Sequence, residues 1–268
     1  MSRPPDTTTT CPYELGDEIP LEDLLAFPPD PRRLGRDERG RLCLVSPENV
    51  PNHRIPISLL NRRLVLALDP RLLLVPEGSV ALPQLLRLRG DPIPESRLGP
   101  RAVEGDLVVF EDPRLARPGF DKSLHVDGVR LVVEVLSRQT WRWDLGLGKA
   151  DQVDRWRSYL RSGVPELWIF HADMRLPTCP LPPWSGLFLR NSRLASSPGT
   201  GGDAWTSLEV EAPGFAACEP FEGLRPLVAG RVRSTTGVVL DVGELMAEAR
   251  ALSAAMAPGG SDSDEAWA

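Results

Sequence analysis

The chain of 268 residues lacks the features of membrane and secreted proteins. It has no run of about eighteen apolar residues, so no transmembrane helix is expected. Residues 1–10 are polar and rich in proline and threonine, without the apolar segment of a signal peptide. The four cysteines are scattered, and none has the Cys-x-x-Cys spacing of many zinc and redox sites. We therefore expect a cytoplasmic protein without a disulfide framework, a zinc site or a membrane partner.

An excess of positive charge is also lacking. The net charge is -6 and the sequence pI is about 5.3. A protein that holds DNA by electrostatics alone is usually basic, so any contact with nucleic acid must come from a local patch. The hydrophobic fraction of 41% is ordinary for a globular protein, and the chain is long enough to bury a sizeable core.

Both ends of the chain lack apolar periodicity. Residues 1–16 are expected to be disordered, and so is the small, acidic tail over residues 258–268. Residues 17–257 are expected to form a single domain. Within it, the stretch 180–205 is rich in proline, glycine and serine and is expected to be irregular.

The periodicity of the central region predicts an α/β fold. Helical spacing of apolar residues predicts four helices, over residues 17–27, 55–68, 149–160 and 240–256. Apolar, mostly β-branched runs predict four strands, over residues 41–45, 106–110, 129–136 and 167–170. Two shorter apolar runs, 72–75 and 79–82, are separated by a Pro-Glu-Gly turn signal. The strand–helix–strand order over 129–170 is typical of a sheet flanked by helices.

Two carboxylates in or beside apolar strands are the candidates for a chemical role. Glu134 interrupts the run Leu-Val-Val-Glu-Val-Leu, where a charge costs several kcal/mol unless it is paired or binds a metal. Asp106 opens the preceding strand. Two carboxylates from adjacent strands form a hard oxygen site suited to Mg²⁺ or Mn²⁺. In the alternative, Glu134 lies on a solvated face and pairs with Arg130 or Arg138.

Three segments together resemble a known family. Residues 104–110 (Glu-Gly-Asp-Leu-Val-Val-Phe), 131–137 (Leu-Val-Val-Glu-Val-Leu-Ser) and 159–170, which begins Tyr-Leu-Arg-Ser-Gly-Val-Pro, are similar to the Uma-two family. This family is a group of restriction-endonuclease-like proteins in the PD-(D/E)XK nuclease superfamily. The resemblance extends over roughly residues 18–250, and its middle part is the most specific.

The resemblance implies a restriction-endonuclease-like mixed sheet flanked by helices. It makes Asp106 and Glu134 the carboxylates that bind Mg²⁺ or Mn²⁺. DNA is the implied substrate, and the family also suggests a homodimer. We therefore expect a metal-dependent endonuclease that hydrolyses DNA phosphodiester bonds. The alternative is a catalytically inactive nuclease-fold protein that binds nucleic acid or a protein partner.

The chain departs from the superfamily at the lysine. The position two residues after Glu134, which is usually lysine, is Leu136. The family is thought to take a lysine from the following helix instead, and Lys149 is the candidate. Arg155, four residues before Tyr159, stands where that lysine is expected, but an arginine cannot act as a base. Either Lys149 takes the role through an insertion, or the enzyme is impaired.

Helical geometry favours Lys149 over Arg155 for this role. Lys149 lies four residues before the apolar Val153, so both would share one helix face. Arg155 lies two residues after Val153 and is expected to face solvent.

His53 is the last candidate site residue. It precedes the helix predicted over 55–68, and a histidine stands at this place in related sequences. It could act as a general base or lie beside the metal. The alternative is a helix-entry residue that bonds only to local backbone. Trp141 and Trp143 flank the expected site and could contact a substrate, although anchoring in the core or a loop also explains them.

Overall fold

The computed structural model describes the chain in segments: residues 34–36, 42–44, 53–82, 102–111, 124–137, 140–147, 154–172, 176, 178–192, 205–210 and 221–256. The chain divides into two compact units, residues 1–48 with 94–99 and residues 49–93 with 100–268. In the first unit, β1 (Leu34–Arg36) and β2 (Leu42–Leu44) form an antiparallel hairpin. This confirms the strand predicted over 41–45. The helix predicted over 17–27 and the two tails lie outside the described residues.

A seven-stranded mixed sheet forms the centre of the second unit. Its strands are β3 (Leu73–Ala81), β4 (Ala102–Phe110), β5 (Leu124–His125), β6 (Val129–Val135), β7 (Glu166–His171), β8 (Ser185–Asn191) and β9 (Trp205–Ser207). Their order is β5-β3-β4-β6-β7-β8-β9. The β3–β5 and β6–β7 pairs are parallel and the other pairs are antiparallel. The fold is therefore α/β with a mixed sheet, as predicted.

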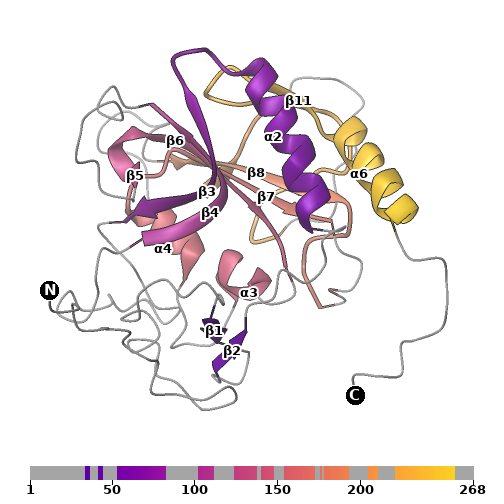
Figure 1. Cartoon of the computed structure of the whole chain (residues 1–268), viewed down its shortest axis with the longest axis horizontal. Helices are drawn as coiled ribbons and strands as arrows, with labels where there is room; N and C mark the ends of the chain where they lie inside the picture. The colour runs from indigo at the N-terminus through magenta and orange to yellow at the C-terminus, as the bar shows by residue number, and fades with distance from the viewer. Residues whose placement is uncertain are drawn as a thin grey trace, which may run out of the picture. The chain divides into compact units, whose positions relative to one another are not determined.

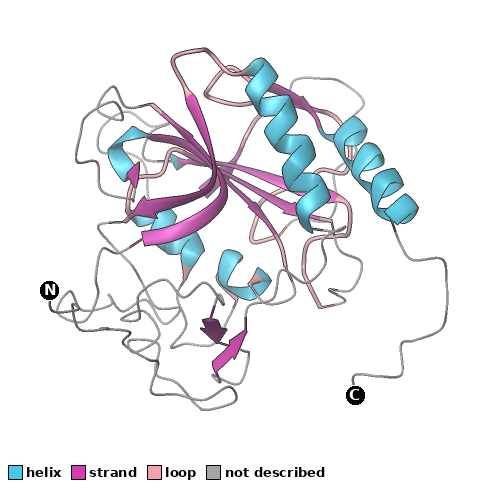
Figure 2. Cartoon of the chain, in the orientation of Figure 1, coloured by secondary structure: helices cyan, strands magenta, loops and turns pink. Residues whose placement is uncertain are grey.

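One face of the sheet packs against two long helices. α2 (Ile55–Ala67) and α6 (Val242–Met256) lie side by side over it, as Figures 1 and 2 show. Leu60 and Leu64 of α2 and Leu245 of α6 are fully buried in the core between helices and sheet. At the outer edge of this layer, Arg63 of α2 pairs with two glutamates of α6. Leucines at helical spacing thus bury the inner faces of both helices, as their periodicity predicts.

The connection between β6 and β7 crosses the sheet. It contains the single-turn helix α3 (Trp141–Asp144) and the helix α4 (Arg155–Arg161). Because β6 and β7 are parallel, the chain must return to the starting edge between them, and helices make this return. The strand–helix–strand prediction over 129–170 is therefore confirmed. α4 begins at Arg155, however, and not near Lys149 as predicted.

Two stretches differ from the sequence prediction. The runs 72–75 and 79–82 form one strand, β3, because the Pro-Glu-Gly segment is an irregularity within the strand and not a turn between two strands. Glu77 has a φ of 50° and lies between the pairs Pro76↔Leu107 and Gly78↔Gly105. The stretch 180–205 contains strand β8, which pairs with β7 along its length. Its expected irregularity was wrong for these residues, because pairing with β7 outweighs the local composition.

The hairpin of β10 (Arg231–Arg233) and β11 (Val239–Asp241) leads into α6. Glu166, the buried first residue of β7, ties this hairpin to the sheet by accepting hydrogen bonds from the backbone N–H and the hydroxyl of Thr235. Among the helices that the structure describes, none has the length and apolar character needed to span a membrane.

Asp154 at the start of α4 provides a test of local stability against pH. Its side chain accepts the Arg157 backbone N–H at 2.8 Å, while its buried Oδ2 accepts no hydrogen bond from the residues that the structure describes. Burial raises the pKa of Asp154 from 3.8 to about 6, against the opposing effects of the Arg157 N–H and guanidinium. Because the folded state then binds more protons than the unfolded state between pH 4 and 6, this group lowers stability as pH rises through that window.

We expect the change Asp154→Asn to remove this pH-dependent loss, because asparagine keeps the helix cap but carries no charge. The free energy of unfolding of wild type relative to the variant should fall by on the order of 2 kcal/mol between pH 4 and pH 7. Urea unfolding at several pH values measures it. Parallel curves for the two proteins would contradict the assignment.

Candidate functional site

Asp106 and Glu134 lie on adjacent central strands, where the β4–β6 ladder ends. The last backbone pair is Leu107↔Val133. One residue further on, the carboxylate of Asp106 accepts the backbone N–H of Val135 at 2.6 Å, in place of a backbone carbonyl. The backbone ladder between β4 and β6 thus ends beside Asp106, whose side chain supplies the next bond between the two strands.

Glu134 points away from the core under α2 and α6. Its neighbours Val133 and Val135 belong to that core, and side chains alternate along a strand. Glu134 therefore faces α4, where its Oε1 accepts the Tyr159 hydroxyl at 2.7 Å. Arg155 Nη1 lies 3.5 Å from both oxygens of Glu134. The alternative in which Glu134 is solvated does not hold, because its side chain is only 4% exposed.

A third carboxylate, Asp144, joins the site from α3. Its Oδ2 accepts the Thr140 hydroxyl at 2.7 Å. Its Oδ1 lies 3.4 Å from Arg155 Nη1 but accepts no hydrogen bond in the described part of the chain. Arg155 therefore lies between two buried carboxylates, Glu134 and Asp144, which reach it from different elements.

His53, just before α2, completes the site. Its Nε2 lies 3.5 Å from Asp106 Oδ2. Burial on its own lowers the pKa of His53, but the hydrogen bond and charge of Asp106 outweigh burial, with help from the charge of Asp144. The pKa of His53 is therefore above its ordinary value of 6.5.

The electrostatics show that these groups form one cluster. Burial raises the pKa of Glu134 well above 4.5; Arg155 opposes the rise, and the charges of Asp144 and Asp106 add to it. Burial likewise raises the pKa of Asp144 to about 6, against the effects of Arg155 and Thr140. Burial alone would lower the pKa of Arg155, but Glu134 and Asp144 raise it above its ordinary value. Three carboxylates thus share one guanidinium and one imidazole, and the cluster retains negative charge when all three are ionised.

The donor set fits a hard divalent cation. Carboxylate oxygens are the ligands that Mg²⁺ and Mn²⁺ prefer, and none of the described residues donates a hydrogen bond to the buried Asp144 Oδ1. No group of three or more His, Cys, Asp or Glu side chains in the described residues is close enough to enclose a metal. Mg²⁺ keeps several waters and is usually bound by one or two carboxylates, so two carboxylates are enough in number to bind it.

Three of the four predicted site residues come together. Asp106, Glu134 and His53 lie in one cluster, and Lys149 lies outside the described residues. The prediction that Arg155 faces solvent was wrong. That prediction assumed that Val153 and Arg155 lie on the same helix. Because α4 begins at Arg155, helical spacing from Val153 does not apply.

Sequence reasoning did not identify Asp144 or Tyr159 as members of the site. Residues four apart on a helix share a face, and Arg155 and Tyr159 have this spacing. Placing Arg155 relative to the buried Tyr159 would have put it on the correct face. Thr140 and Asp144 have the same spacing, which indicates that both belong to one helical turn after β6.

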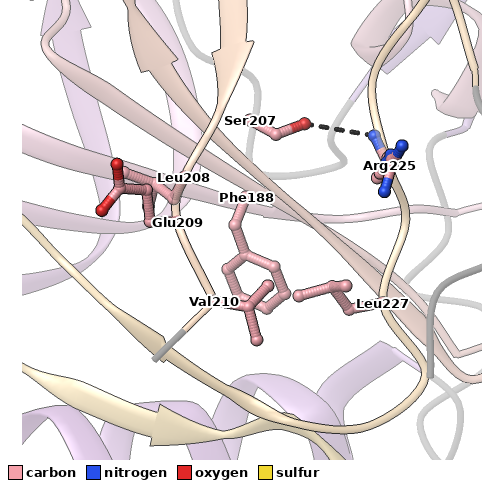
Figure 3. Close-up of a pocket in the computed structure, with 7 residues that line it drawn as sticks. All are labelled: Phe188, Ser207, Leu208, Glu209, Val210, Arg225 and Leu227. Carbon is pink, nitrogen blue, oxygen red and sulfur yellow. Dashed lines mark hydrogen bonds between the residues drawn. The ribbon is translucent and has the colours of Figure 1, made fainter. Parts of the chain in front are cut away.

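A pocket within the described residues lies apart from this cluster. This open pocket of about 380 Å³ is lined by residues near β8 and β9, shown in Figure 3, where the Ser207 hydroxyl oxygen accepts a hydrogen bond from the backbone N–H of Arg225. Phe188, Val210 and Leu227 meet at this pocket. Phe188 and Leu227 belong to the core under α2 and α6, and Val210 packs against it, so this pocket lies at the edge of that core. None of the clustered carboxylates lines it.

Comparison with protein-family models, with curated proteins and with solved structures finds no match for this chain.

Arg155 is expected to be a principal source of stability for the cluster. The change Arg155→Met keeps much of the side-chain volume and removes the charge, which leaves Glu134 and Asp144 buried without their cation. Breaking a buried ion pair in this way costs about 3–5 kcal/mol. Chemical unfolding at pH 7 measures the loss. It should shrink as pH falls toward 5, because the two carboxylates can then take up protons.

The matched control is Arg161→Met, which removes an exposed arginine from the same helix. It should change stability by less than about 0.5 kcal/mol. The double change Arg155→Met with Glu134→Gln should recover part of the loss, because one uncompensated charge is removed. Equal losses from the two arginine variants would contradict the role given to Arg155.

Proposed function

We propose that this protein is a metal-dependent endonuclease that hydrolyses DNA phosphodiester bonds and has a restriction-endonuclease-like fold. The observation that carries the proposal is the position of Asp106 and Glu134 on adjacent central strands, just beyond the last backbone pair of β4 and β6 and inside one charged cluster. The three segments that carry the resemblance are β4, β6 and the end of α4 with β7. They are far apart in the sequence, yet they supply Asp106, Glu134 and Tyr159 to the same site.

In this proposal Asp106 and Glu134 hold Mg²⁺ or Mn²⁺. A bound divalent ion lowers the pKa of a coordinated water and neutralises charge that builds up on a phosphodiester. Tyr159 orients Glu134 through its hydrogen bond, and the Val135 N–H orients Asp106. Both carboxylates are thereby fixed before any ligand arrives.

His53 is the proposed proton acceptor. Its imidazole can take a proton from a water molecule when it is neutral, and the neighbouring Asp106 carboxylate stabilises the imidazolium that results. Arg155 has no such role, because a guanidinium does not give up its proton in proteins. The role proposed for Lys149 is to position the attacking water or the phosphate.

The second candidate is a catalytically silent relative that binds nucleic acid or a protein partner. The observation that favours it is the cation at the site. The two lysines of the chain, Lys122 and Lys149, lie outside the described residues, and the described residues place Arg155 beside Glu134. This guanidinium and the hydroxyl of Tyr159 already compensate Glu134, as they would in a purely structural ion pair.

Cleavage of duplex DNA with Mg²⁺ or Mn²⁺, compared with EDTA, separates the two candidates. We expect cleavage by the wild type, with losses of at least about 100-fold for Asp106→Asn and Glu134→Gln, because each removes a charged ligand. Lys149→Ala should also reduce the rate. Glu111→Gln, which neutralises an exposed carboxylate just after β4, is the matched control and should cleave like the wild type.

Calorimetric titration with Mn²⁺ gives a second readout that does not need cleavage. Binding should be lost in Asp106→Asn and kept in Glu111→Gln. Mn²⁺ binding without cleavage by the wild type would establish the silent relative. Absence of both would overturn the metal site.

A further inference from the structure

Asp144 is a buried member of the site that has no role in the reaction proposed above. Its side chain is 1% exposed, and burying a carboxylate costs several kcal/mol unless its oxygens find partners. One oxygen has the Thr140 hydroxyl, whereas the other faces Arg155 without a hydrogen bond in the part of the chain described.

A chain of hydroxyl groups fixes Asp144 relative to the sheet. Thr140 gives its single hydroxyl proton to Asp144 Oδ2, so in the 2.9 Å contact between Thr140 and Ser137 the donor must be Ser137. The backbone N–H of Thr140 in turn bonds to the Ser137 oxygen at 3.2 Å. Ser137 follows β6 by two residues, and Leu136 between them bonds to β7. Asp144 is therefore held at a fixed distance from the strand that carries Glu134.

Arg155 is held by this arrangement at one nitrogen only. Nη1 lies 3.4 Å from Asp144 and 3.5 Å from each Glu134 oxygen. A guanidinium has five N–H groups on three nitrogens. Within the described residues, Nε and Nη2 of Arg155 have no acceptor, and the side chain is 21% exposed. These N–H groups can therefore reach a ligand that enters the site.

We propose that Asp144 is the positioning residue of Arg155, and that Arg155 binds a phosphate group of the substrate through Nε and Nη2. Asp144 and Glu134 attract Nη1 from two sides, which restricts the rotation of the guanidinium. A fixed, planar pair of N–H donors matches two oxygens of a phosphate. The positioning half of this proposal stands on the contacts above, and the phosphate half rests on the proposed nuclease function.

The test uses Thr140, because its variants disturb Asp144 without removing a charge. Thr140→Val has the same shape and lacks the hydroxyl, and Thr140→Ser restores it. Thr206→Val, the same change at an exposed position of β9, is the control. Thermal unfolding and circular dichroism identify any variant that fails to fold.

The first measurement is the NMR signal of the Arg155 guanidinium, assigned by its absence in Arg155→Lys. An immobilised guanidinium gives separate Nη signals, whereas a freely rotating one gives averaged signals. We expect separate signals in the wild type, Thr140→Ser and Thr206→Val, and averaged signals in Thr140→Val and Asp144→Asn. Unchanged signals in both of the last two variants would overturn the positioning role.

The second measurement is the rate of DNA cleavage by the same variants. Thr140→Val should lower the rate by about 10- to 100-fold, the usual effect of losing an outer partner of a site residue. Thr140→Ser should restore it. Averaged NMR signals with an unchanged rate would overturn the phosphate contact. Averaged signals in the variants, with no cleavage by the wild type, would instead overturn the nuclease function and leave the positioning role in place.

Discussion

The interaction between Glu134 and Arg155 is the constraint on which the site depends. A carboxylate buried in the central strand of a sheet is tolerated only if charge and hydrogen bonds compensate it. Arg155 and Tyr159 supply both, and they lie one turn apart on α4. The need to compensate Glu134 therefore fixes how α4 lies against β6, and Asp144 fixes the same guanidinium from α3.

The same strand serves the core and the site because its side chains alternate. Val133 and Val135 pack under α2 and α6, and Glu134 between them faces α4. A shift of one residue in the register of β6 would bury Glu134 in the apolar core and expose two valines to the charged cluster. The hydrophobic core therefore positions Glu134, and the register Leu107↔Val133 places Asp106 beside it on the neighbouring strand.

The parts of this structure that the sequence predicted are those set by local pattern. Apolar β-branched runs marked β4, β6 and β7, and leucine spacing marked α2 and α6 within a few residues. The charges of Asp106 and Glu134 beside apolar residues identified both as candidates. The prediction that Asp106 opens its strand was wrong, because β4 begins at Ala102. The start of α4 was missed because it is set by Asp154. Its side chain caps the helix by accepting the Arg157 backbone N–H, a contact that only the structure shows. Asp144 was missed because its membership in the site arises from its contact with Arg155 of the next helix and from the charge of His53, neither of which a local sequence pattern reveals.

With Arg155 beside the carboxylates, the proposed reaction needs one residue to supply positive charge and another to accept a proton. A lysine beside the carboxylates could both carry charge and exchange a proton, whereas Arg155 keeps its proton at any physiological pH. Buried next to Glu134 and Asp144, its guanidinium is held still more firmly in the charged form. Proton transfer must then fall to another group, and in the described part of the cluster His53 is the one whose ordinary pKa lies near neutrality. Because Asp106 contacts His53, the proposed proton acceptor and the proposed metal would be coupled through this one carboxylate.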